Sequence, residues 1–235
     1  MEKNISPIDY FKGITKENIY TANITIEEKI HDVIPKNCKD IFSSSFSDVE
    51  DYGFNFTKDI RLKEKFNEMG MFCFVSWAWV NPLVEWLGNK KCLEVMAGRG
   101  WLSHALRQKG VDVVATDDFS WHGMPQFSKW IDIVTEIEDL DAVEAVRKYG
   151  KNIDVLIMTW AYMDNVAYKT IKELHKVNPQ AKIIVCGEGR GGCTADDKFF
   201  DHFDEIEDED FYRNVASKYE TWNGLHDRLT LGRYI

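Results

Sequence analysis

The sequence has little of what marks a secreted protein. Its 235 residues include five cysteines, an odd number, and none of them forms a C-x-x-C pair. Cys92 and Cys186 lie in apolar runs typical of strands, where a free thiol behaves as a small apolar group. The N-terminus is polar and of mixed charge, unlike a secretory signal. The pattern therefore predicts a reducing, cytoplasmic location and no disulfide framework.

Long apolar runs, basic runs and metal-ligand spacings are missing as well. The longest apolar stretch, Met71 to Leu87, is interrupted by Asn81 and Glu85 and is too short and polar for a membrane span. The formal net charge is −10, which argues against broad, non-specific nucleic-acid binding. No group of His, Cys and Asp residues has metal-ligand spacing. We expect no metal, no membrane contact, and a small molecule or a protein side chain as the partner; the oligomeric state is not predicted.

Local residue composition divides the chain into two parts. Residues 1–65 are polar and predict a partly helical N-terminal extension, in which the isoleucines between Ile24 and Ile34 indicate a short amphipathic helix. From about residue 66, an aromatic helix is followed by alternating strands and helices. The predicted helices are 74–87, 101–109, 141–149, 166–177 and 210–218. The predicted strands are 92–96, 111–116, 131–137, 153–159 and 181–186, with two more within 219–234.

Strands that are continuously apolar and alternate with helices indicate a parallel sheet covered on both faces. The strands expected within 219–234 would form an antiparallel pair at the end of this sheet. We therefore predict an α/β fold over residues 66–235. In open sheets of this kind, ligands bind beyond the carboxyl ends of the strands.

A glycine turn lies between the first predicted strand and its helix. It contains Gly98 and Gly100, and the next strand ends at Asp117 and Asp118. This order builds a nucleotide-type cofactor site, because glycines let the backbone approach a ligand and a carboxylate accepts hydrogen bonds from ribose hydroxyls. Asp117 follows Gly98 by about 20 residues, as that role requires. The alternative is a strand–turn–helix connection with no ligand.

Two residues depart from the dinucleotide pattern. Ser103 replaces the third glycine, and Glu94 lies on the strand just before the turn. A carboxylate there would repel a pyrophosphate but could hold a cationic amino group. S-adenosylmethionine carries an amino group and a sulfonium and has no phosphate, so the local charge favours this cofactor over NAD. The alternative for Glu94 is to cap nearby backbone N–H groups.

Several segments together carry a resemblance to a known superfamily. They are Ser76-Trp77-Ala78-Trp79-Val80-Asn81-Pro82, the glycine turn from Leu93 to Trp101, Met158-Thr159-Trp160-Ala161-Tyr162, the run GEGRGGCTADD at 187–197, and Trp222 to Asp227. Over roughly residues 70–235 the chain resembles class I S-adenosylmethionine-dependent methyltransferases, and more closely a little-characterised methyltransferase-like family. The resemblance implies a Rossmann-like, mostly parallel seven-stranded sheet with a C-terminal antiparallel strand pair.

The chain departs from this family at two positions. Met96 stands where the cofactor turn usually has its first glycine. The sequence Trp160-Ala161-Tyr162-Met163 stands where the family usually has Trp-Pro-Pro-Tyr. The loss of both prolines loosens that backbone, because proline fixes φ. A catalytically silent sensor or partner subunit that binds S-adenosylmethionine is therefore the alternative to an enzyme. A nucleotide or dinucleotide enzyme is a third hypothesis, which Glu94 and Ser103 disfavour.

The candidate cofactor-binding residues follow the strand ends. They are Trp79, Glu94, Ala97, Gly98, Gly100, Trp101, Asp117, Asp118, Asp141 and Thr159. Glu94 is assigned to the amino end of the cofactor and Asp117 to the ribose hydroxyls. The alternative for Trp79 and Trp101 is core packing, and for the aspartates it is helix capping.

The candidate catalytic residues are Trp160, Tyr162, Glu188 and His226. Trp160 and Tyr162 follow the fourth predicted strand, beside the expected position of the transferred methyl group. Glu188, in the glycine-rich loop after the fifth strand, is the first general-base candidate and His226 is the second. The alternatives are a salt bridge to an arginine for Glu188 and a structural hydrogen bond for His226.

Overall fold

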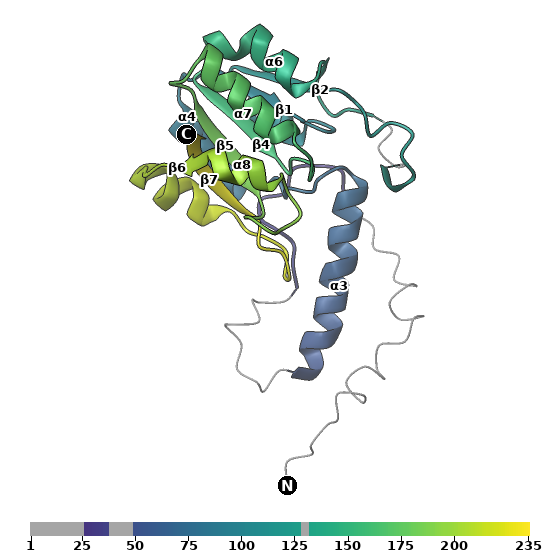
Figure 1. The fold of residues 1–235 in the computed structure, drawn as a ribbon. Coiled ribbons are helices and arrows are strands. Elements are labelled where there is room, and N and C mark those ends of the chain that lie inside the picture. Colours follow the sequence, from purple (N-terminus) through teal and green to yellow (C-terminus); the bar gives the residue numbers. More distant parts are fainter. Residues whose placement is uncertain (1–25, 38–48, 128–131) are drawn as a thin grey trace.

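The computed structural model describes residues 26–37, 49–127 and 132–235. These residues are built around one seven-stranded sheet with the strand order β3-β2-β1-β4-β5-β7-β6 (Figure 1). The strands are β1 (Cys92–Val95), β2 (Val113–Asp117), β3 (Glu138–Asp139), β4 (Val155–Thr159), β5 (Lys182–Gly187), β6 (Phe203–Glu205) and β7 (Arg228–Tyr234). The pairs from β3 to β5 are parallel, whereas β7 is antiparallel to both β5 and β6. The predicted Rossmann-like α/β architecture, a mostly parallel seven-stranded sheet with a C-terminal antiparallel strand pair, is confirmed.

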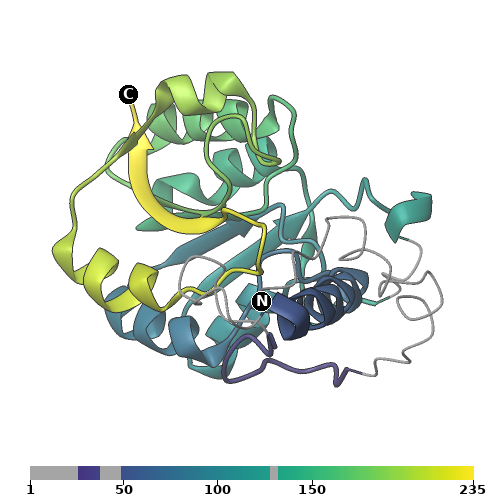
Figure 2. The same ribbon diagram turned by 90° about the horizontal axis from the view of Figure 1, so that it is seen from below.

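Helices cover both faces of the sheet (Figure 2). They are α3 (Val49–Glu68), α4 (Trp77–Leu87), α5 (Trp101–Gln108), α6 (Ala142–Tyr149), α7 (Val166–Val177) and α8 (Asp197–His202). One core cluster joins α4, α5 and the helical turn Phe211–Val215 to one face, and a second joins α6, α7 and α8 to the other. Every residue of β1 is buried, as expected of a parallel strand covered on both sides.

Residues 26–37 contain no helix, so the predicted amphipathic helix is wrong over this range, and Ile24 lies outside the described residues. The segment forms a β-bridge between His31 and Ser76. The backbone carbonyl of His31 accepts a hydrogen bond from the backbone N–H of Trp77. These bonds to the start of α4 replace the bonds of a helix, while Ile30 and Ile34 are buried in the core.

Two predicted strands differ from those observed. The strand expected at 131–137 is absent from 132–137, and the edge strand β3 begins only at Glu138; residue 131 lies outside the described part of the chain. The antiparallel pair expected within 219–234 is formed instead by β7 and β6, while 219–227 are irregular. Local side-chain contacts explain the second difference, because the hydroxyls of Tyr219 and Thr221 donate to the buried carboxylate of Asp227.

Helix α3 runs across the division expected at residue 65 and projects away from the sheet (Figure 1). Its last turn is anchored to the core by Phe66, which is fully buried and contacts the rings of Phe74 and Trp222. The division into extension and domain stays a prediction. Among the described residues, no helix has the length and apolar character needed to cross a membrane.

Candidate functional site

A cavity of about 520 Å³ opens at the carboxyl ends of β1, β2 and β4. It lies where the strand order reverses, because β1 pairs with β2 on one side and with β4 on the other. This is the place where open α/β sheets bind ligands, and the volume is typical of small-molecule sites. The predicted residues that line it are Glu94, Ala97, Gly98, Trp101, Asp117, Asp118, Thr159, Trp160 and Tyr162.

Glu94 is a buried carboxylate at the wall of the cavity, with 1% of its surface exposed. It accepts hydrogen bonds from the backbone N–H (2.9 Å) and the hydroxyl of Ser103 on α5, and from the Thr159 hydroxyl (3.4 Å). Burial raises the pKa of Glu94 to about 7, against the lowering effect of these hydrogen bonds. Glu94 thus caps α5 and also presents an ionisable group to the cavity.

Asp117 ends β2 and holds the glycine turn in place. Its Oδ2 accepts from the backbone N–H of Gly98 (2.7 Å), and its Oδ1 accepts from the backbone N–H of Phe119 (2.8 Å) and from Nε1 of Trp121 (3.0 Å). Burial raises the pKa of Asp117 despite these bonds. Because a carboxylate has about four acceptor sites, at least one remains for a ligand.

Asp118 is the more exposed member of the acidic pair. Its Oδ1 accepts from the backbone N–H of Ser120 (2.9 Å), a local turn contact. Met96, at the usual first glycine position, has a positive φ of 55° and also lines the cavity. A left-handed conformation costs a non-glycine residue about 1–2 kcal/mol, so the fold retains some strain at this turn.

The loop after β4 forms the aromatic side of the cavity. Trp160 has a φ of 52°, and its backbone N–H donates to the carbonyl of Cys186 (2.8 Å). Its ring lies 5.9 Å from the ring of Phe72, and its Nε1 donates to Asp227 (3.4 Å). Tyr162, by contrast, is 71% exposed at the rim. The loop therefore offers one fixed and one exposed aromatic side chain.

The glycine-rich loop after β5 is bound to the loop after β4. The backbone N–H of Ala195 donates to the carbonyl of Ala161 (3.1 Å). Glu188 accepts from the backbone N–H groups of Cys193 (2.8 Å) and His226 (3.2 Å). Partial burial raises the pKa of Glu188, but these bonds hold it below its ordinary value. Neither Glu188 nor His226 lines the cavity, although Cys193 does.

Three predicted cofactor residues lie outside the cavity. Trp79 is fully buried, and its indole N–H donates to the carbonyl of Phe74 (2.9 Å). Asp141 caps α6, accepting from the backbone N–H groups of Val143 and Glu144. Gly100 is the N-cap of α5. Each of them has a structural role that accounts for the residue type.

Gly100 has a φ of 84°, and a methyl group added there would lie 2.9 Å from side-chain carbons of Ile137 and Thr135. We expect Gly100→Ala to lower the free energy of unfolding by about 2 kcal/mol, through left-handed strain and overpacking. Urea denaturation measures this. Gly110→Ala is the matched control, since Gly110 also has a positive φ (80°) but open space around it. Equal losses in both variants would show that the Ile137 contact is unimportant.

Three residues that shape the site were not among the predicted site residues. Phe72 and Phe127 line the cavity and contact each other edge to face, with ring centroids 6.2 Å apart. Asp227 is buried and accepts hydrogen bonds from Tyr219, Thr221 and Trp160. The C-terminal segment thereby orients Trp160, a contact between residues about 67 positions apart.

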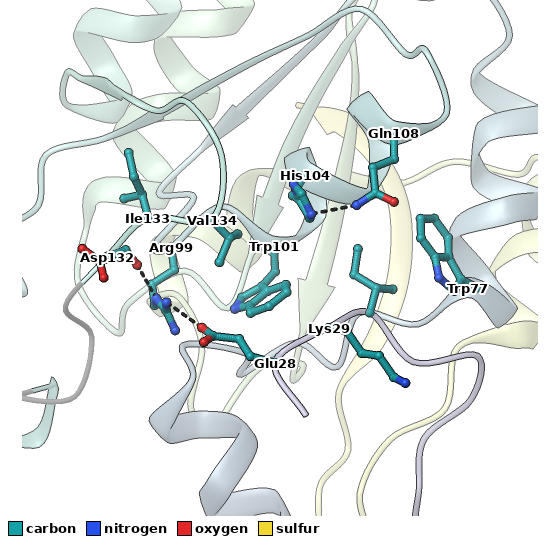
Figure 3. A pocket seen from close by; sticks show the side chains of 11 residues that line it. Glu28, Lys29, Trp77, Arg99, Trp101, His104, Gln108, Asp132, Ile133 and Val134 are labelled. Atoms are coloured by element: carbon teal, nitrogen blue, oxygen red, sulfur yellow. Dashed lines mark hydrogen bonds and ion pairs between the residues drawn. The ribbon is translucent and has the colours of Figure 1, made fainter. Parts of the chain in front are cut away.

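A second cavity of about 490 Å³ lies on the other side of Trp101. Figure 3 shows Trp101 between two pairs of polar side chains that line this second cavity. Arg99 pairs with Glu28 (2.7 Å), and Gln108 contacts His104 (2.7 Å). Trp101 is therefore the wall between the two cavities, and its indole N–H is held by the carbonyl of Met69 (2.7 Å). Within the described ranges, no three His, Cys, Asp or Glu residues are grouped as a metal site.

Comparisons with known proteins give structural likeness only. No family model and no curated protein matches the chain. It is similar to magnesium protoporphyrin IX methyltransferase from Synechocystis PCC 6803, solved with bound S-adenosylmethionine, with 15% identity over 76% of this chain and 83% of that one and a TM-score of 0.42. It is also similar to 1,6-didemethyltoxoflavin-N1-methyltransferase from Burkholderia thailandensis, solved with S-adenosylhomocysteine (13% identity, 82% and 92% of the two chains, TM-score 0.42). Likeness at this level does not place the chain in a family.

Proposed function

We propose that this protein is an S-adenosylmethionine-dependent methyltransferase that acts on a small molecule or a protein side chain. The observation that carries the proposal is the charge of the cavity at the strand ends. Its ionisable acidic residues are Glu94, Asp117, Asp118 and Asp164, and no described residue in its lining is Lys, Arg or His. Such a lining repels the phosphates of NAD and attracts a sulfonium and an amino group.

The residues present fit this cofactor. Glu94 would receive the amino end, because a buried carboxylate is stabilised by a cationic partner. Asp117 at the end of β2 and Asp118 directly after it would accept hydrogen bonds from the ribose hydroxyls. Gly98, with a φ of 57°, lets the backbone approach. When bound, S-adenosylmethionine supplies a methyl group on a positively charged sulfur.

The chain itself would contribute mainly orientation. Trp160 is fixed by Phe72 and Asp227, so it offers a rigid face against which an acceptor can be held. Removal of a proton by Glu188 or His226 stays a prediction. The low pKa of Glu188 and its two backbone donors favour a role in holding the loop. A cytoplasmic location likewise stays a prediction.

Calorimetric titration of the purified protein with S-adenosylmethionine, S-adenosylhomocysteine and NAD tests the proposal. We expect binding of both adenosyl ligands and none of NAD. Absence of binding to both would refute the cofactor assignment. Release of S-adenosylhomocysteine in the presence of cell extract would then distinguish an enzyme from a silent sensor, which would bind the cofactor without turning it over.

Asp117→Asn should weaken S-adenosylmethionine binding about tenfold, because a hydrogen bond to a charged acceptor contributes about 1.5–3 kcal/mol. The matched control is Asp112→Asn. Asp112 is exposed and precedes β2, at the opposite end of the same strand. Calorimetry compares the two affinities, and circular dichroism checks the fold. Unchanged affinity in Asp117→Asn would rule out its role at the ribose.

A further inference from the structure

We infer that the methyl acceptor is an arylalkylamine, a flat aromatic ring that bears an aliphatic amine, an inference that rests on the proposed methyl transfer. Such an amine would bind as its ammonium and lose a proton to water at the open mouth of the cavity. Its nitrogen lone pair would then bond to the methyl carbon as the carbon–sulfur bond breaks, which leaves S-adenosylhomocysteine as the second product. Two independent properties of the cavity lead to this inference. The first is the sign of its charge, and the second is the arrangement of aromatic rings beside the strand ends.

The outer part of the cavity carries negative charge even when Glu94, the residue assigned to the cofactor's amino end, is left aside. Asp164, in the loop between β4 and α7, is exposed and lines the cavity. Its Oδ1 accepts from the backbone N–H of Val166 (2.9 Å). Within the described part of the chain, neither Asp164 nor Asp118 is paired with a basic side chain. Carboxylates without a cationic partner attract a positively charged ligand and repel an anionic one.

In the part of the chain that the structure describes, a lysine outside the lining acts on the rim of the cavity. Lys63 on α3 lowers the pKa of the Cys193 thiol, although Glu188, whose effect is larger, raises it overall. Among the described residues, this cation is opposed by the carboxylates of Asp118 and Asp164 at the mouth, so their net contribution there is negative. An anionic acceptor would therefore have to approach against the charge of Asp118 and Asp164.

Aromatic side chains supply the second property. Phe72 contacts Trp160 on one side (5.9 Å between ring centroids) and Phe127 on the other (6.2 Å). Tyr162 and Met124, which are 71% and 40% exposed, extend this apolar surface to the rim. Planar rings stack on such surfaces, and electron-rich rings also attract cations. A flat ring that bears an aliphatic amine, which is cationic at neutral pH, satisfies both the aromatic wall and the negative mouth.

A matched pair of ligands tests the inference. Tryptamine and indole-3-acetate share one ring system and differ in an amine against a carboxylate. Each is titrated calorimetrically into the protein saturated with S-adenosylhomocysteine. We expect tryptamine to bind at least about tenfold more tightly than indole-3-acetate, since the carboxylates at the mouth attract the ammonium and repel the second carboxylate. Cyclohexylethylamine, which keeps the charge but lacks the aromatic ring, should bind more weakly than tryptamine.

Asp164→Asn isolates the charge, because asparagine can still accept from the N–H of Val166. The preference for tryptamine over indole-3-acetate should narrow about threefold in this variant and stay unchanged in Asp112→Asn, outside the cavity. Equal affinities, tighter binding of indole-3-acetate, or binding of neither ligand would overturn the inference while S-adenosylhomocysteine still binds. If the unmodified protein does not bind S-adenosylhomocysteine at all, the proposed function itself is refuted.

Discussion

Glu94→Gln weakens binding of S-adenosylmethionine about 100-fold at alkaline pH, because truncating one member of a buried charge pair costs several kcal/mol. The substituted amide keeps an acceptor for the backbone N–H of Ser103, so the cap of α5 survives. What the variant loses is the negative charge that a cationic amino group requires. The effect should exceed that of Asp117→Asn, since Asp117 is assigned to neutral hydroxyls.

The same side chain predicts a pH dependence of affinity. Below pH 7 the unliganded protein holds Glu94 mainly protonated, because burial raises its pKa to about 7. A cationic ligand must then displace that proton, so affinity should fall about tenfold for each pH unit below 7. Calorimetry in buffers of different ionisation heat would detect the proton released on binding. Affinity that is constant between about pH 5.5 and pH 8 would contradict the assignment.

The stability of the unliganded protein should depend on pH in the opposite sense, so that it falls as the pH rises. The folded-state pKa of Glu94 lies above its ordinary value of 4.5, so the protonated form stabilises the fold. This stabilisation is complete below pH 4.5 and disappears as the pH rises through 7, a loss of about 3 kcal/mol. Urea denaturation at several pH values, with Glu94→Gln as the reference lacking this titration, isolates the contribution. Parallel pH profiles for both proteins would disprove it.

Asp227→Ala lowers the free energy of unfolding by about 3 kcal/mol. Asp227 is 5% exposed and accepts from the hydroxyls of Tyr219 and Thr221 and from Nε1 of Trp160. Alanine leaves these donors without their acceptor, and an unsatisfied buried donor costs about 1–3 kcal/mol. Urea denaturation followed by circular dichroism measures the loss.

Asp227→Asn is the matched control, since its single carbonyl oxygen keeps part of the acceptor capacity and should cost roughly half as much. A second measurement follows the site itself. Trp160 loses a contact that fixes its ring, so tryptamine affinity should fall in Asp227→Ala even where the variant is fully folded. Stability equal to that of the unmodified protein would show that water replaces the carboxylate.

The residues at the strand ends could be predicted from sequence, because apolar runs and the positions of glycines are local features of the sequence. Glu94 lies within the first apolar strand, Asp117 ends the second and Trp160 follows the fourth, and the parallel sheet brings such positions together. Trp79 was misleading because aromatic residues at helical spacing serve a core and a ligand site equally well. Its burial and its bond to Phe74 were visible only in the structure.

Other features depended on contacts between distant residues, which no local pattern encodes. The short strand β6 has only three residues, and its pairing with β7 is what makes it a strand. Residues 26–37 follow an amphipathic pattern, yet their bonds go to the start of α4. Asp227 ends the segment from Trp222 to Asp227 that carries the resemblance, yet nothing in that segment indicates its contact with Trp160.

The position of β7 between β5 and β6 has a consequence for synthesis on the ribosome. Residues 203–205 leave the exit tunnel before residues 228–234, so β6 has no partner when it first appears, and β5 exposes an unpaired edge. Exposed strand edges invite association between chains. The nascent protein therefore passes through an interval in which its sheet is open, and slow translation across residues 206–227 would lengthen that interval and favour aggregation.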